Sequence, residues 1–160
     1  MTPDETKLRS AIIQAATDFL TAGNSIDTEQ GTITNLPTMP AKNIAWENKK
    51  FESPEKSVWA NVSLIPATSG GRTIGKGGFD EDTSILQIDI NTPSEKGEAD
   101  MIPWQSKLRV FFHGGRTFTY EGYSVLVKSS SISQGRTFHS YYRKSISVNF
   151  SSYLKRHQTT

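Results

Sequence analysis

The sequence predicts an α+β fold with a mainly antiparallel sheet, on the strength of two periodicities. Residues 3–22 repeat apolar side chains every three or four positions, which is typical of an amphipathic helix. Residues 57–66 and 83–92 alternate apolar and polar side chains, which is typical of half-buried strands. With 160 residues, one domain over 1–160 is the expected organisation. A long β-hairpin arm covered by an N-terminal helix and a second helix satisfies all of these patterns.

The predicted N-terminal helix covers residues 3–22. Pro3 and the acidic residues behind it suit a first turn, where negative charge opposes the helix dipole. Gly23 and Asn24 supply a stop signal. The apolar stripe consists of Leu8, Ala11, Ile12, Ala15, Ala16 and Phe19.

Residues 24–56 are predicted to form an extended arm. The segment is long and mostly polar, it carries three prolines, and it contains two isolated aromatic residues, Trp46 and Phe51. A loop of this length inside a compact domain is usually functional or laid against something. We therefore expect a short strand around Asn43–Trp46, and we expect both aromatic residues to anchor the arm on its own sheet or on a neighbouring subunit.

Residues 57–92 are predicted to form a long hairpin whose connection, GGRTIGKGG, resembles a nucleotide-binding loop. Gly77 stands where such a loop needs a Ser or Thr to hold magnesium, and a strand pattern follows instead of a helix. Nucleotide binding is therefore not expected. The glycines make the connection costly to order alone, so we expect it to become ordered against a neighbouring subunit or another partner. The residues expected to make those contacts are Arg72, Ile74, Lys76 and Phe79.

A second helix is predicted within residues 94–113, where Trp104, Leu108 and Phe111 form an apolar stripe. Pro103 would cost about 3 kcal/mol in a helix interior, so the helix either starts near Ile102 or has an irregular first turn.

The C-terminal third is predicted to form a hairpin over residues 117–150, followed by a basic tail over 151–160. Tyr123, Val125 and Val127 alternate with polar residues, and a Ser/Gly-rich turn follows them. A second alternating run ends near Phe150.

Composition limits the possible functions. Cysteine is absent, which excludes disulfides and thiolate metal sites, and no apolar run reaches the length of a membrane span. Nor does the N-terminus show a secretion signal. Only 34% of the residues are hydrophobic, and the mean hydropathy is −0.50. A chain this polar often completes its burial against partners.

Charge is divided along the chain. Residues 1–100 hold 9 Lys/Arg and 15 Asp/Glu, a balance of −6, whereas residues 101–160 hold 9 Lys/Arg and one acid, Glu121, a balance of +8. Such a division is compatible with a nucleic-acid surface, with two matching faces on copies of one protein, or with charges scattered over a solvated surface.

Catalytic and metal sites are not expected. The histidines at 113, 139 and 157 lie far apart, no serine lies in a G-x-S-x-G turn, and Asp80, Glu81 and Asp82 lack calcium-loop spacing. We predict that the chain is not an enzyme and needs no cofactor.

A single-stranded nucleic-acid surface is an alternative, because basic residues alternate with aromatic residues near the C-terminus. The simpler interpretation, which we favour, is that aromatic residues at alternate strand positions belong to the core. The residues concerned are Arg116, Lys128, Arg136, Arg143, Lys144, Lys155 and Arg156, with Phe118, Tyr120, Tyr123, Phe138, Tyr141 and Tyr142.

Several short motifs occur in a fixed order along the chain. The sequences AWEN (45–48) and F-x-x-P (51–54) lie in the arm, LIP ends the first strand, and NTP (91–93) ends the second. Gly97 and Ala99 then precede a helix that ends in aromatic residues. From about Asn43 to Phe150, this order resembles the tail terminator-like proteins of long non-contractile-tailed bacteriophages. Pro103 and Trp104 depart from the uninterrupted Ala/Leu-rich helix expected at that position.

The resemblance implies a structural virion protein without enzymatic activity. Such proteins form a ring, usually of six copies, on the head-proximal end of the tail tube, where the ring ends tube polymerisation. The implied partners are further copies of the chain, the tail tube protein and the head–tail connector, with genomic DNA passing through the lumen without specific binding. Assembly would take place in the host bacterial cytoplasm. The alternatives are another phage neck or connector protein, the nucleic-acid-binding module and, least favoured, a small hydrolase.

Overall fold

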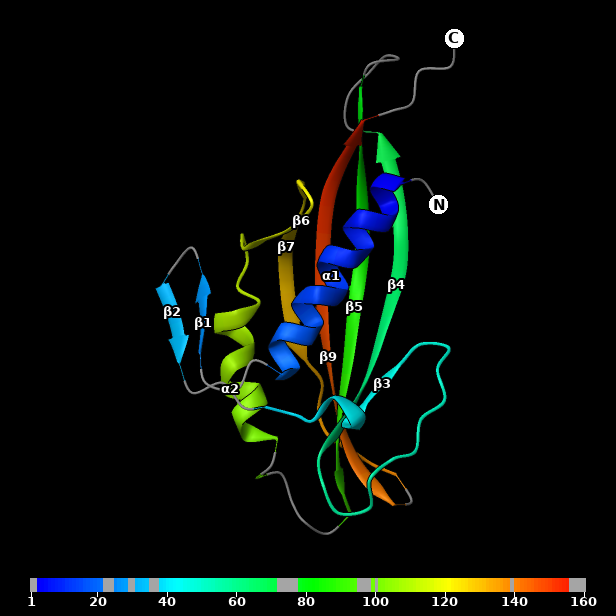
Figure 1. Cartoon of the computed structure of the whole chain (residues 1–160), viewed down its shortest axis with the longest axis vertical. Helices are drawn as coiled ribbons and strands as arrows, with labels where there is room; N and C mark the ends of the chain where they lie inside the picture. The colour runs from blue at the N-terminus through cyan, green and yellow to red at the C-terminus, as the bar shows by residue number, and fades with distance from the viewer. Residues whose placement is uncertain are drawn as a thin grey trace.

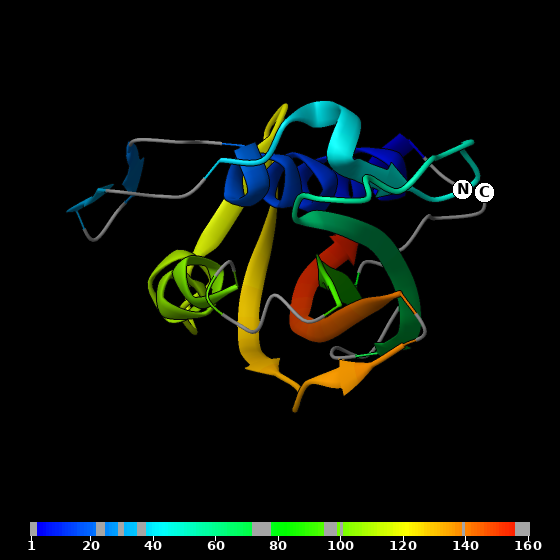
Figure 2. The same cartoon turned by 90° about the horizontal axis from the view of Figure 1, so that it is seen from below.

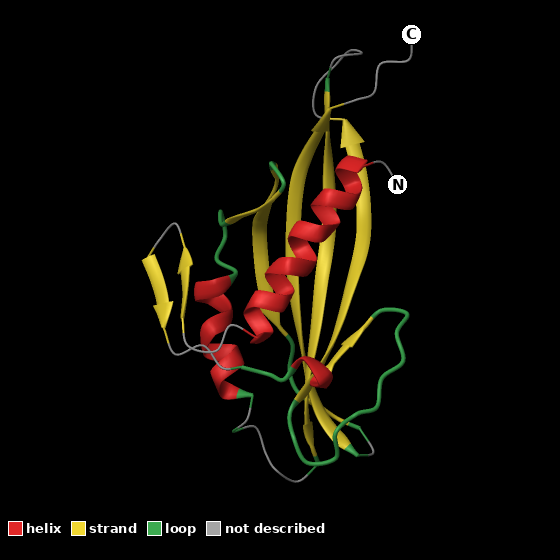
Figure 3. Cartoon of the chain, in the orientation of Figure 1, coloured by secondary structure: helices red, strands yellow, loops and turns green. Residues whose placement is uncertain are grey.

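A computed structural model gives the architecture of the chain (Figures 1 and 3). It describes residues 3–21, 25–28, 31–34, 38–71, 78–94, 99, 101–138 and 140–155. Within these residues, two α-helices accompany a mainly antiparallel sheet of seven strands, so the predicted α+β class is confirmed. The strands of the sheet follow the order β3-β4-β5-β9-β7-β6, and β8 pairs with β9.

Helix α1 (Pro3–Thr21) lies diagonally across one face of the sheet (Figure 1). Its bounds agree with the predicted helix over 3–22. The predicted apolar stripe is buried against the sheet, from Leu8 at 5% exposure to Phe19 at 0%. The helix therefore forms for the reason that the periodicity indicated, which is burial of one face.

Three long strands form the centre of the sheet. β4 (Trp59–Gly71) and β5 (Phe79–Pro93) make the predicted long hairpin, and β5 also pairs along its whole length with β9 (Tyr141–Lys155). Seen from below, these strands curl strongly beneath α1 (Figure 2). β5 thus lies between β4 and β9, and its alternate side chains Leu86, Ile88 and Ile90 are buried.

The arm over 24–56 contains more structure than predicted. β3 (Ile44–Trp46) confirms the expected short strand and pairs in parallel with β4, after a 3₁₀ turn at Ala41–Asn43. Earlier in the arm, β1 (Ser25–Thr28) and β2 (Gly31–Thr34) pair with each other and stand away from the main sheet (Figures 1 and 2). The chain is extended in both strands, as predicted for the arm, but their pairing with each other was not predicted.

Helix α2 (Ile102–Phe111) begins at Ile102, directly before Pro103, which is one of the two starts that the sequence allowed. Pro103 lies in the first turn, where its missing N–H has no helical partner to lose. The helix is shorter than the predicted span of 94–113, of which residues 95–98 and 100 lie outside the described part.

Four strands form the C-terminal region, where one hairpin was predicted. They are β6 (Thr117–Tyr120), β7 (Tyr123–Ile132), β8 (Arg136–Thr137) and β9. Glu121 and Gly122 connect β6 to β7 with φ values of 48° and 86°, which is the backbone of a tight two-residue hairpin. β9 also continues to Lys155, so strand structure occupies the start of the predicted basic tail.

The core lies between the helices and the sheet. Phe19 of α1 contacts the rings of Trp104, Phe111 and Phe112 at centroid distances of 5.7, 5.2 and 5.2 Å. Phe112 and Phe118 extend the aromatic cluster to Phe150 of β9. These contacts fix α2 against the C-terminal half of α1.

Candidate functional site

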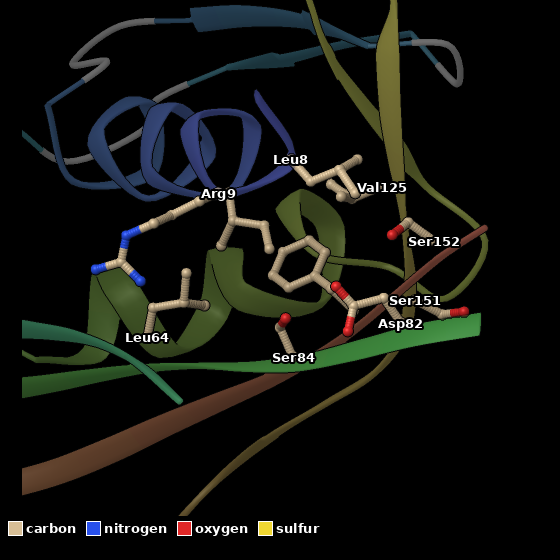
Figure 4. A pocket seen from close by; sticks show the side chains of 10 residues that line it. Leu8, Arg9, Leu64, Asp82, Ser84, Val125, Ser151 and Ser152 are labelled. Atoms are coloured by element: carbon tan, nitrogen blue, oxygen red, sulfur yellow. The ribbon is translucent and has the colours of Figure 1, made fainter. Parts of the chain in front are cut away.

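A cavity of about 350 Å³ lies between α1 and the sheet (Figure 4). Its walls include Leu8 and Ile12 from the helix and Phe150 from β9. Figure 4 places Arg9 and Leu64 at one end and Asp82, Ser151 and Ser152 at the other. The cavity is therefore mainly apolar in the middle, with polar side chains at both ends.

A second groove, of about 290 Å³, adjoins this cavity on the β3 side and is also lined by Arg9 and Leu64. Trp46 and Glu47 contribute to its wall. The guanidinium of Arg9 lies 3.1 Å from the Glu47 carboxylate, so one ion pair stands where the two hollows meet.

Glu47 also contacts the edge of the sheet. Its second carboxylate oxygen accepts the backbone N–H of Leu64 at 2.9 Å. The side chain of Glu47, the residue after β3, thus connects α1 to the edge of β4.

Both aromatic residues of the arm pack on their own sheet. Trp46 is partly buried against the core, and Phe51 lies 5.3 Å from the ring of Trp59. Trp59 in turn contacts Tyr141 at 5.5 Å. The anchoring of the arm to its own subunit is therefore visible, while any further contact of Trp46 or Phe51 with a neighbour stays a prediction.

The glycine-rich connection joins two paired strands. Residues 72–77 lie outside the described part, and with them the predicted contact residues Arg72, Ile74 and Lys76. Phe79, the fourth, is the first residue of β5 and pairs with Lys155 of β9. A strand follows the glycines where a nucleotide-binding loop requires a helix.

The face of the sheet opposite α1 is polar. Asp89 lies in its centre at 8% exposure, where Ser145 donates to one carboxylate oxygen at 2.6 Å and Arg143 Nη1 lies 3.8 Å from the other. Arg143 Nε donates to Asn91 at 2.7 Å, and Asn149 donates to Ser129 at 2.8 Å. Around Asp89, this face is therefore joined by hydrogen bonds and by the Asp89–Arg143 ion pair.

Comparison with known proteins identifies the family. The model of the phage tail terminator protein family matches residues 31–150, which is three quarters of the chain. The chain belongs to the phage tail terminator family. Among solved structures, one chain that carries no functional name superposes with a TM-score of 0.64 at 19% identity, over 95% of this chain and 95% of that one. That likeness shows the fold alone. No curated protein matches.

Tail terminators are structural proteins of the phage tail, and the suspected family is thereby confirmed. Among the residues that the structure describes, no three His, Asp or Glu side chains gather as a metal site would need. Within the same residues, neither helix has the length and apolar character to cross a membrane.

Two of the basic residues that suggested nucleic-acid binding have structural partners in this tail terminator. Arg116 is 6% exposed, lies over the rings of Phe111 and Phe118, and donates to the Phe111 carbonyl at 2.5 Å. Arg143 is held by Asn91 and lies 5.0 Å from the ring of Phe138. Neither guanidinium forms part of an open basic platform.

Sequence reasoning missed Glu47 and Asp89. Glu47 follows a short strand and looks like any exposed acid, since nothing in the spacing links it to Leu64. Asp89 carried a usable signal, because an acid at the centre of a strand flanked by isoleucines needs partners. The alternation of Ser145 and Arg143 on the neighbouring strand is the pattern that supplies them.

Proposed function

We propose that six copies of this chain form a ring on the head-proximal end of a phage tail tube. The ring stops tube polymerisation and presents the surface that the head connector joins. DNA passes through its lumen without specific binding, and assembly takes place in the host bacterial cytoplasm before the ring becomes part of the virion. The observation that carries the proposal is the match to the tail terminator family over residues 31–150.

A ring needs two different patches on each subunit that match each other. The structure offers two surfaces of contrasting character. One is the cavity between α1 and the sheet, with its polar ends and exposed Arg9–Glu47 pair. The other is the outer side of α2, where Ile102 and Val110 are 53% and 49% exposed with Arg109 beside them. Exposed apolar residues near a cation are a common feature of interface patches.

The decisive experiment adds the purified chain to polymerising tube protein from the same phage. Electron microscopy of the mixture, with the chain labelled, should show label at one end of each tube and tubes that stop growing. Label along the tube walls, or unchanged growth at equal stoichiometry, would contradict the proposal. Binding of the labelled chain to heads in the absence of tails would favour another neck protein.

The glycine-rich connection provides a variant for the same assay. We propose that residues 70–78 contact a neighbouring subunit or the tube through Arg72, Ile74 and Lys76, with Phe79 at the start of β5. Deleting 70–78 should leave a folded subunit that no longer caps tubes. Ile74→Ser keeps the length of the connection and removes only the apolar side chain at position 74. Comparing it with the deletion shows whether that side chain makes the contact. Normal capping by the deletion variant would remove this segment from the account.

A further inference from the structure

The two edges of the main sheet differ in how they are protected. On the outer edge of β4, the Glu47 carboxylate accepts the outward N–H of Leu64, and Pro66 follows two residues later. The opposite edge is β6, which comes last in the strand order and has β7 on one side. Its sequence, TFTY, contains neither a proline nor a charged residue. The β6 edge therefore lacks both devices that close the β4 edge.

Backbone hydrogen bonds fix which groups of β6 point outward. The two-residue turn after Tyr120 makes this residue face β7, and Val127 donates its N–H to the Arg116 carbonyl at 2.8 Å. Alternation along the strand then directs the N–H and C=O groups of Thr117 and Thr119 away from β7. Within the described part of the chain, these outward groups make no hydrogen bond. Thr119 is exposed, so a second strand has access to this edge.

The β1–β2 hairpin is a pair of strands that lies apart from the sheet of its own subunit. β1 and β2 pair with each other over four residues each and form a separate two-stranded sheet (Figures 1 and 2). An isolated two-stranded hairpin is at best marginally stable in water. By alternation, each of its outer edges presents two backbone positions, the same number that β6 offers. A third strand would stabilise the hairpin, and β6 has the matching length of four residues.

Charge complementarity supports a second copy of this chain as the partner. Residues 25–34, which contain the hairpin, carry Asp27 and Glu29 and no basic residue. β6 lies within residues 101–160, where the charge balance is +8 and Glu121 is the single acid. The Glu121 carboxylate is paired with Lys7 at 3.2 Å. An acidic hairpin that approaches β6 therefore meets a region with an excess of cations.

We propose that the β1–β2 hairpin of one copy adds to the β6 edge of a second copy, which extends the sheet across two subunits. The extended backbone of the hairpin supplies the N–H and C=O groups that match those of Thr117 and Thr119. The β4 edge is closed to the same pairing by Glu47 and Pro66, so the hairpin discriminates between the two edges of the described sheet. The contact needs two copies and is independent of the number of copies in the proposed ring.

The first test removes one outward N–H from β6. Thr119→Pro deletes the N–H that points away from β7 and leaves the hydrogen bonds between β6 and β7 in place, since proline is tolerated at such edge positions. Thr119→Val is the matched control, because it keeps the N–H and a β-branched side chain. In sedimentation velocity, the association constant should be about tenfold lower for Thr119→Pro than for Thr119→Val. Equal association of the two variants would overturn the proposal, as would a wild-type chain that stays monomeric up to its solubility limit.

A mixing experiment tests which segment occupies the edge. In the linker variant, a Gly/Ser sequence of equal length replaces residues 25–34, so the chain keeps the β6 edge and lacks the hairpin. Thr119→Pro keeps the hairpin and has a weakened edge. Each variant should associate poorly alone, whereas their mixture should form 1:1 pairs near twice the chain mass of 17.8 kDa in native mass spectrometry. Association of the linker variant with itself would reject the hairpin as the occupant, because it would show that two β6 edges pair.

Hydrogen exchange at the Thr117 and Thr119 amides locates the contact. Both amides should exchange rapidly in the linker variant and slowly in associated wild-type chains. Rapid exchange in associated wild-type chains would place the contact elsewhere and reject the proposal. If circular dichroism shows that Thr119→Pro does not fold, the linker variant carries the test alone. It should then stay monomeric at concentrations where the wild type associates, and equal association would reject the proposal.

These outcomes are separate from the tube-capping assay. A chain that caps tubes, and whose linker variant associates like the wild type, would reject the hairpin contact and leave the ring proposal intact. A chain that associates through its hairpin and never caps tubes would reject the ring and leave the contact intact.

Discussion

The two faces of the sheet contrast in how they are completed. On the face toward α1, side chains such as Leu86, Ile88 and Val148 are fully buried by the chain's own helices. On the opposite face, the same strands carry Asp89, Asn91 and Ser145, which are joined to one another and to Arg143 by hydrogen bonds and an ion pair. One face is completed by apolar burial, and the centre of the other is completed by polar contacts.

This difference explains the low hydrophobic content of 34%. The main apolar layer lies between the sheet and the helices, and on the opposite face apolar cover is provided near Trp59 by Phe51 of the arm and by Tyr141. Partners are therefore not required to complete the core. Contacts with partners are proposed at smaller surfaces such as the outer side of α2, where Ile102 and Val110 are exposed.

The largest expected effect comes from the apolar face. Phe19→Ala should reduce the free energy of unfolding by about 3–5 kcal/mol, because a fully buried ring in contact with three others is replaced by a cavity. Urea denaturation followed by circular dichroism measures the change. Ser147→Ala, on the polar face, is the matched control and should change stability by less than about 0.5 kcal/mol. Similar losses in the two variants would remove the contrast between the faces.

The next effect tests a buried charge. Arg116→Met should cost about 2 kcal/mol, because it removes the charged hydrogen bond to the Phe111 carbonyl and the stacking on two rings, while methionine keeps most of the apolar volume. Equilibrium denaturation gives the loss, and an oligonucleotide titration of both proteins gives the control. A large fall in oligonucleotide affinity with unchanged stability would instead support the nucleic-acid interpretation.

A smaller effect is expected for the arm. Phe51→Ala should lower stability by about 1 kcal/mol, since its ring is half-buried and has one aromatic partner, Trp59. The same variant should be tested in ring formation, where Trp46→Ala is its companion. A loss in assembly that exceeds the loss in monomer stability would show that the arm also contacts a neighbouring subunit.

Periodicity predicted the parts of the fold that depend on local burial. α1 and the hairpin of β4 and β5 follow from the repeat of apolar residues, and Pro103 marks the start of α2. The division of the C-terminal region was not predicted, because the turn at Glu121 needs a left-handed backbone at a residue type that seldom signals it.

Contacts between distant segments were beyond the reach of sequence patterns. Arg116 reads as a solvated cation beside an aromatic residue, and only the packing of α2 on β6 shows that it is enclosed. Glu47 reads as an exposed acid, and its link to Leu64 depends on the parallel placement of β3 beside β4. Propensity and spacing carry no information on such pairings.

The smallest expected effect concerns charge between subunits. If the segment of balance −6 in one copy faces the segment of balance +8 in the next, the proposed ring should weaken as salt rises. Exposed charges farther apart than about 8 Å are screened at physiological ionic strength. The structure limits the size of this effect, because Arg116, Arg143 and Asp89 make contacts within their own subunit. Native mass spectrometry or light scattering from low to high salt would follow a ring of six times the 17.8 kDa chain mass. A ring that persists unchanged at high salt would show that apolar contacts dominate, and the exposed side of α2, with Ile102 and Val110, would become the first surface to mutate.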